Sequence, residues 1–305
     1  MLKKALYNLK KGNNGDIHDE YQYISLISDI LNDGKLVKGR NGNTLCVFGS
    51  AMHFNLENNI IPILTTKKVA WKTCAKELFW FIKGSTNNNI LKNQNVNIWN
   101  GNGSREFLDS RGLNHLNEND LGPVYGHQWR FFNAEYTNCN DNYIGKGVDQ
   151  LQYIINSLKD PTERYSRRLI MSAWNPQQLD QMALPPCHVL AQFNVIDNEL
   201  SCSLYQRSGD VGLGVPFNIA SYSFLTHILA KHCNLKAKDF VYYLGNAHIY
   251  DDHIDVLKEQ IDRKPIEFPK INILNKYESI EEYSLEDIEI INYNSHESIK
   301  MEMRK

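Results

Sequence analysis

The segment from Ile219 to Lys231 constrains the fold more than any other part of the chain. Its residues are largely apolar, and an apolar helix is stable only where other elements cover it. The chain has 305 residues, enough to bury such a helix, and it contains no internal repeat and no Pro-, Gly- or Ser-rich linker. We therefore expect a single domain over residues 18–305, preceded by a flexible polar tail over residues 1–17.

The other periodic segments mix helices and strands. Apolar residues at helical spacing predict helices that end near Asp33, Ile82 and Leu158, the last of them starting at Val148. Apolar or alternating runs predict strands over 45–54, 169–173, 189–195 and 200–205, and Asp197-Asn198 predicts a hairpin turn between the last two. The order shows no regular βαβ rhythm, and the sequence contains neither G-x-G-x-x-G nor G-x-x-x-x-G-K-[ST]. An α+β fold is therefore favoured over Rossmann and P-loop folds.

Composition excludes several classes of function. Lys and Arg number 33 and Asp and Glu 35, so the net charge of −2 disfavours a long nucleic acid as the main partner. No apolar run approaches the roughly 18 residues of a membrane span, and the first residues have no leader-like apolar core. The six cysteines are spread out with no C-x-x-C pair, which indicates neither a disulfide framework nor a metal site. A cytoplasmic location is expected.

Cys187 is the candidate nucleophile. It follows Pro185-Pro186 at a rigid turn just before a predicted strand, where a side chain can face a cleft. A buried core thiol is the alternative interpretation, because free cysteine is among the most buried residue types. A nearby cation would lower the pKa of the thiol and favour the nucleophilic thiolate.

Arginines at two places can supply that cation and bind an anion. Arg207 and Ser208 follow the strand predicted over 200–205, and we place Arg207 at the end of that strand. Arg167 and Arg168 precede another predicted strand. Arginine pairs suit bidentate recognition of phosphate, although a solvated surface is the alternative in both cases.

Three further positions carry polar groups that need a partner. Asn218 precedes the apolar helix, where it can be an N-cap or can read a base edge, since a carboxamide matches N3–H and O4 of uracil. His248 and Tyr250 share one face of a strand and can bond sugar hydroxyls or each other. Glu77 lies on the apolar face of a predicted helix, where it is either paired or an acid/base with a raised pKa.

Several long motifs in order make the chain resemble the thymidylate synthases from about Asp19 to Met303. The matching segments are Trp80-Phe81-Ile82-Lys83-Gly84-Ser85-Thr86-Asn87, Ile98-Trp99-Asn100-Gly101-Asn102-Gly103-Ser104-Arg105, Asp120-Leu121-Gly122-Pro123-Val124-Tyr125-Gly126, Ala183-Leu184-Pro185-Pro186-Cys187-His188, Gln206-Arg207-Ser208-Gly209-Asp210 and His248-Ile249-Tyr250. The resemblance implies a mixed β-sheet with packed helices in a sheet-mediated homodimer. It also implies reductive methylation of dUMP to dTMP, with 5,10-methylenetetrahydrofolate consumed as carbon and hydride donor and dihydrofolate as the second product, and no metal.

The resemblance also implies roles for individual residues. Catalysis is assigned to Cys187, Glu77, Tyr125, Arg207 and Asp210. Contacts with dUMP are assigned to Arg40, Arg167, Arg168, His188, Gln206, Arg207, Ser208, Gly209, Asp210, Asn218, His248, Ile249 and Tyr250, with Arg167 and Arg168 contributed across the dimer interface. Contacts with the folate are assigned to Ile98, Trp99, Asn102, Asp210, Gly214, Phe217, Met303 and Arg304.

Two departures from the family pattern lie near these positions. Arg304-Lys305 stands where the family has two small apolar residues, which predicts slower closure over the site or altered folate affinity. The loop that carries Arg40 is one residue shorter than usual. The alternatives are a pyrimidine hydroxymethylase, in which water captures the methylene intermediate, and a catalytically silent nucleotide- or RNA-binding homologue. Asn218 disfavours a dCMP substrate, and Trp99 favours a shielded intermediate.

Overall fold

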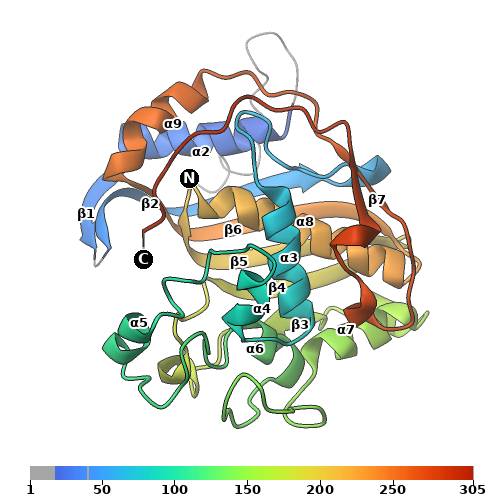
Figure 1. Ribbon diagram of the computed structural model, residues 1–305. Coiled ribbons are helices and arrows are strands. Elements are labelled where there is room, and N and C mark those ends of the chain that lie inside the picture. Colours follow the sequence, from blue (N-terminus) through green and yellow to red (C-terminus); the bar gives the residue numbers. More distant parts are fainter. Residues whose placement is uncertain (1–17, 40, 305) are drawn as a thin grey trace.

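The computed structural model describes residues 18–39 and 41–304, and a six-stranded mixed sheet forms its centre (Figure 1). The predicted tail over 1–17, the prediction for Arg40 and the side chain of Lys305 lie outside the described residues. The α-helices are α2 (Glu20–Asp33), α3 (Trp71–Ile82), α4 (Asn88–Lys92), α5 (Arg105–Ser110), α6 (Tyr125–Phe131), α7 (Gln150–Lys159), α8 (Gly214–His232) and α9 (Ile254–Ile261). The strands are β1 (Lys35–Gly39), β2 (Gly42–Asn55), β3 (Ile170–Ser172), β4 (His188–Ile196), β5 (Glu199–Asp210), β6 (Lys236–Tyr250), β7 (Lys270–Ile273) and β8 (Ile288–Ile291).

The large sheet has the strand order β1-β2-β6-β5-β4-β3, and β7 and β8 form a separate two-stranded sheet. The pair β5–β6 is parallel, while the other neighbours are antiparallel. A parallel pair needs a crossover, and α8 provides it. The large sheet thus contains one βαβ unit inside an otherwise antiparallel arrangement, in agreement with the predicted absence of a regular βαβ rhythm.

Helix α8 is the apolar helix that the sequence predicts, and nearly all of it is buried. It packs on β5 and β6 and against α3, which lies beside it in Figure 1. Two of its hydroxyls are satisfied within the helix: Ser223 donates to Ile219 O and Thr226 to Tyr222 O, both at 2.7 Å. Such bonds let hydroxyls sit in an apolar core without an unpaired donor.

The turn between β4 and β5 confirms the prediction at Asp197-Asn198. Both residues have positive φ, 50° and 61°, as a two-residue hairpin turn requires, and Asn and Asp tolerate this conformation better than other non-glycine residues. The turn sets the register in which Phe193 pairs with Cys202. It therefore fixes β4, which begins one residue after Cys187, against β5.

Two predicted boundaries were wrong. Helix α7 starts at Gln150 and leaves Val148 outside, because Asp149 caps the helix by accepting from the Gln152 N–H. Strand β5 continues past Tyr205 to Asp210, because its last residues pair with β6 up to His248. The sequence after Tyr205 is polar and does not read as a strand, so only the neighbouring strand explains its conformation.

Helix α6 is held in place by two glycines. Gly122, just before it, has φ of 72°, and a Cβ there would lie 2.0 Å from Gln181 O. A Cβ on Gly126 would lie 2.7 Å from Ser85 O. Only glycine fits both contacts, and the close packing places Tyr125, the first residue of α6, in the interior.

Candidate active site

The Pro185-Pro186 turn holds Cys187 directly before β4. Arg207 clamps this turn: its Nε donates to Pro186 O and its Nη2 to Pro185 O, both at 2.9 Å. The backbone N–H of Arg207 also donates to Cys187 O at 3.0 Å. The prediction that Arg207 lies at a strand end was wrong, because Arg207 is inside β5, where the strand ladder fixes its backbone.

The charge state of Cys187 reflects two opposed effects. Burial raises the pKa of the Cys187 thiol, and the Arg207 guanidinium acts in the opposite direction. Arg207 therefore has the effect expected of a nearby cation, but burial outweighs it. The net result favours the thiol over the thiolate.

Tyr125 is bonded to the backbone of the candidate nucleophile. The Cys187 N–H donates to the Tyr125 hydroxyl oxygen at 2.7 Å, and the two ring centroids of Tyr125 and His188 are 5.0 Å apart. Burial raises the pKa of Tyr125 well above its usual value. The phenol therefore keeps its proton and can donate it in a further hydrogen bond.

Glu77 lies on α3 with its carboxyl group facing the interior. Trp99 Nε1 donates to Glu77 Oε1 at 2.7 Å, and the Trp99 ring lies 6.1 Å from that of Tyr125. Burial raises the pKa of Glu77 to about 7, and the bond from Trp99 opposes this rise. Glu77 therefore has both features between which the sequence left a choice, a hydrogen-bond partner and a raised pKa, and contacts through Trp99 and Tyr125 connect it to Cys187.

Asn218 is not an N-cap, contrary to the interpretation from spacing. Helix α8 begins at Gly214, and Pro216 is accommodated because the first-turn nitrogens of a helix have no intrahelical acceptor. Asn218 is buried, and its Nδ2 donates to His188 Nε2 at 2.7 Å. Burial lowers the pKa of His188 to about 4, so a neutral ring accepts this bond.

The sequence analysis missed Tyr242, which completes the contacts of Asn218. Its hydroxyl donates to Gln206 Oε1 at 2.6 Å and lies 3.4 Å from Asn218 Oδ1. Gln206 Nε2 in turn donates to Ser208 O at 2.9 Å. The alternation of buried residues along β6 was the available signal, because Tyr242 shares a face with two apolar neighbours.

Asp210 ends β5 and shapes the connection to α8. Its Oδ1 accepts from the N–H groups of Gly212 at 2.9 Å and Leu213 at 3.3 Å. Gly214 and Phe217 follow in the first turn of α8, both partly buried, and Gly209 precedes it in the interior. The predicted positions Gly209, Asp210, Gly214 and Phe217 therefore follow one another from the end of β5 into the first turn of α8.

His248 and Tyr250 lie at the end of β6, as predicted, with ring centroids 5.3 Å apart. His248 Nδ1–H donates to Asn246 Oδ1 at 2.9 Å, which leaves Nε2 as an acceptor in the neutral ring. Burial lowers the pKa of His248. Ile249 between them is buried and faces the other side of the sheet.

The remaining predicted residues lie on loops. Arg167 and Arg168 are exposed just before β3. Ile98 and Asn102 are partly buried between α4 and α5, beside the buried Trp99. Met303 and Arg304 are exposed, and Arg304 forms an ion pair with Asp252 at 2.8 Å. The structure thus brings the predicted chemical groups together in the interior and leaves the predicted cations mostly at the surface.

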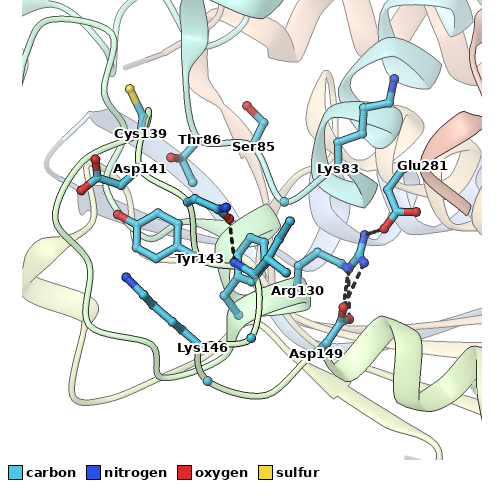
Figure 2. Close-up of a pocket in the computed structure, with 16 residues that line it drawn as sticks. Lys83, Ser85, Thr86, Arg130, Cys139, Asp141, Tyr143, Lys146, Asp149 and Glu281 are labelled. Atoms are coloured by element: carbon cyan, nitrogen blue, oxygen red, sulfur yellow. Dashed lines mark hydrogen bonds and ion pairs between the residues drawn. The ribbon is translucent and has the colours of Figure 1, made fainter. Parts of the chain in front are cut away.

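A cavity of about 650 Å³ is lined by residues other than the predicted site residues (Figure 2). Arg130 on its wall is held by Asp149, with Nη2 2.9 Å from Oδ2, and by Glu281. Lys83, Tyr143 and Lys146 also line it. The charged lining residues balance, because three cations (Lys83, Arg130 and Lys146) accompany three carboxylates (Asp141, Asp149 and Glu281).

Within residues 18–39 and 41–304, no group of three or more His, Cys, Asp or Glu side chains is arranged to hold a metal ion. None of the described helices combines the length and apolar character that a membrane crossing demands.

Comparison with known proteins shows the family of the chain. The family model described as thymidylate synthase matches residues 21–305. Human thymidylate synthase is 54% identical over 287 residues, which cover 94% of this chain and 91% of the human protein. The bifunctional dihydrofolate reductase-thymidylate synthase of Plasmodium berghei is 52% identical over 98% of this chain and 50% of its own length.

The bifunctional protein of Zea mays is 50% identical over 94% of this chain and 55% of its own length. The chain therefore spans about half the length of these two bifunctional relatives and most of the length of the human one. With a family match over nearly the whole chain and more than half of the residues shared with a relative of similar length, this chain belongs to the thymidylate synthase family.

Proposed function

We propose that the protein catalyses the reductive methylation of dUMP to dTMP, with 5,10-methylenetetrahydrofolate as donor of the carbon and the hydride and dihydrofolate as second product. One observation carries the proposal: a thiol, a phenol, a carboxyl group and a carboxamide lie along one chain of contacts in the interior. The contacts are Glu77 to Trp99, Tyr125 to the Cys187 backbone, and His188 to Asn218.

Cys187 is the proposed nucleophile, adding through sulfur to C6 of the uracil so that C5 becomes nucleophilic. The Pro185-Pro186 turn and the Arg207 clamp support this role, because they fix the position of the thiol. Burial favours the thiol over the thiolate, so the thiolate has to form in the presence of substrate. The Arg207 guanidinium favours the thiolate, because it opposes the effect of burial on the pKa of Cys187.

Asn218 is the proposed uracil-selecting residue. Its carboxamide is bonded to His188 at one end and lies beside Tyr242 at the other, so its donor and acceptor are held in fixed directions. A fixed carboxamide can accept from N3–H and donate to O4 of uracil, whereas cytosine presents the opposite pattern at these atoms.

Glu77 and Tyr125 are the proposed proton-handling groups. A carboxyl group with a pKa of about 7 is half protonated at neutral pH, which suits both giving and taking a proton. Tyr125 stays protonated and can position a water for removal of the C5 proton. The neutral rings of Trp99 and Phe217, with Ile98 nearby, fit the apolar part of a folate.

Asp210 is proposed to bond the pterin of the folate, and Arg207 with Ser208 the phosphate of dUMP. His248 and Tyr250 are proposed for the deoxyribose, because two neighbouring polar side chains at one strand end can both bond its single free hydroxyl, at C3′. Arg40, Arg167 and Arg168 complete the phosphate site in this proposal, the last two from a partner subunit.

A cytoplasmic homodimer formed by the large sheets is the proposed assembly. One face of the sheet packs on α8 and α2, while Tyr205 and Tyr243 on the opposite face are 41% and 43% exposed. Ser201, Ser203 and Val241 on that face are only partly buried. An uncovered face with aromatic side chains is typical of an interface, and six free cysteines fit a reducing compartment.

A single-turnover reaction tests the proposal. Purified protein is mixed with dUMP and a limiting amount of 5,10-methylenetetrahydrofolate, and both products are identified by mass and absorbance. We expect dTMP and dihydrofolate in equal amounts. Hydroxymethyl-dUMP with tetrahydrofolate would instead identify a hydroxymethylase, and binding of dUMP without any product would identify a silent homologue.

A further inference from the structure

The segment Met301–Arg304 lies against two connections at the Asp210 end of the candidate site. A Cβ on Gly212 would be 2.9 Å from Met301 Sδ, so this segment packs on the β5–α8 connection. The other connection is η4 (Asp251–His253), directly after β6. His253 Nε2–H donates to Glu302 O at 2.8 Å, and His253 Nδ1 lies 3.8 Å from Asp210 Oδ1.

Arg304 adds two ionic contacts to the same connection. Its Nη2 is 2.8 Å from Asp252 Oδ2 and 3.7 Å from Asp251 Oδ1. Asp251 also accepts from Asn43 Nδ2 at 3.3 Å, and Asn43 is the second residue of β2. Asp251 therefore lies between segment 301–304 and the start of the strand that follows Arg40.

We propose that Arg304 is a positioning residue for the folate: its ion pair with Asp252 and Asp251 holds segment 301–304 across the Asp210 end of the site. The inference rests on the proposed function. The ion pair stabilises this arrangement of the segment, so less ordering entropy opposes the binding of a folate beneath it. The pair deepens the assignment of Arg304, because Arg304 acts through Asp252 and Asp251 and not by touching the folate.

The size of the effect follows from the exposure of the pair. Arg304 and Asp252 side chains are 36% and 35% exposed, and exposed ion pairs shift an equilibrium by about two- to fivefold. Salt screens such a pair over about 10 Å at 0.1 M ionic strength. Loss of the pair is therefore expected to raise KM for the folate by about threefold, with kcat and KM for dUMP nearly unchanged.

Four variants test the pair in steady-state kinetics at low and high salt: Arg304→Ala, Asp252→Ala, the double variant, and Arg304→Lys. Each single alanine variant is expected to raise KM for the folate about threefold at low salt and less at high salt. The double variant should be no worse than either single variant, and Arg304→Lys should recover most of the affinity. The control is Lys258→Ala, which removes an exposed pair with Asp255 (3.3 Å) in α9.

Two outcomes would overturn the inference. One is an unchanged KM for the folate in Arg304→Ala; the other is a double variant whose effect is the product of the single effects, which would mean that Arg304 and Asp252 act independently. The charge-swapped protein Arg304→Asp with Asp252→Arg supplies a further check, since it should regain part of the lost affinity. If the wild-type protein makes no dTMP, the proposed function fails; if it makes dTMP and these variants do not differ, only this inference fails.

Discussion

The base end and the phosphate end of the candidate site are built in different ways. At the base end, hydrogen bonds fix Cys187, Tyr125 and Asn218: the Cys187 N–H donates to the Tyr125 hydroxyl, and Asn218 donates to His188, the residue after Cys187. At the phosphate end, Arg167 and Arg168 are exposed on a surface loop. The contrast teaches that one chain can fix the chemical groups by itself, whereas the exposed cations would gain a defined position from the partner surface that the proposed dimer supplies.

Loss of the nucleophile should have the largest effect, because the base end depends on one sulfur atom. Cys187→Ser is expected to lower kcat by about a thousandfold or more, since a serine hydroxyl is a far weaker nucleophile toward C6. Binding of dUMP, measured by calorimetry, should stay within a few-fold of wild type, because the Arg207 clamp bonds the carbonyl groups of Pro185 and Pro186 and not the sulfur.

The matched control is Cys139→Ser. Cys139 is partly buried and lines the cavity beside Arg130, outside the candidate site. Its turnover should equal that of wild type. A Cys187→Ser protein that keeps its activity would show that the nucleophile lies elsewhere.

Glu77→Gln comes second in expected size. The amide keeps the shape of the carboxyl group but cannot exchange a proton, so kcat should fall by about a hundredfold. The limb of the pH profile near pH 7, where the Glu77 carboxyl group titrates, should disappear. An unchanged limb would assign that titration to another group.

The same variant should be more stable than wild type at high pH. The folded pKa of Glu77, about 7, lies above the value of about 4.3 in unfolded chains. Ionisation therefore destabilises the folded protein as pH rises from about 4 through 7, and no cost remains where both states are protonated. Thermal unfolding of Glu77→Gln should show a gain on the order of 2 kcal/mol at pH 8 and almost none at pH 4.

The base end also shows what the sequence can and cannot predict. Glu77 on an apolar helix face was predictable because α3 has a clear 3.6-residue period and the exception stands out. The extension of β5 through Arg207 and Ser208 was not, because those polar residues are a strand only by pairing with β6. The position of Asn218 relative to α8 was predicted wrongly for a different reason: a proline in the first turn hides the true start of the helix.

The short helices show a second limit. α4, α5 and α6 have only five to seven residues, too few to be stable alone, so tertiary contacts decide them. The location of Tyr125 depends on such a helix and on two glycine contacts. The resemblance supplied the identity of Tyr125 as a candidate, whereas the periodicity of the sequence around it carried no such signal.

The phosphate end provides a smaller expected effect than the base end and the sharpest test of the comparison. Arg167→Glu should raise KM for dUMP by about tenfold or more, because a charge-assisted phosphate contact is replaced by repulsion. If Arg167 serves the partner's site, a mixture of Arg167→Glu and Cys187→Ser subunits forms heterodimers with one intact site each. After random exchange at low dUMP concentration, activity should approach about one quarter of wild type, since half of the dimers are mixed and half of their sites are intact.

Mixing Cys187→Ser with Glu77→Gln is the matched control, because both groups lie in the interior of the same subunit and no mixed dimer regains a complete site. That mixture should stay inactive. Recovery in the first mixture and none in the second would separate groups fixed within one chain from groups supplied by a partner. If the activity of the first mixture equals the mean of its two components, Arg167 belongs to the site of its own subunit. A partner surface would then not explain why Arg167 and Arg168 are exposed.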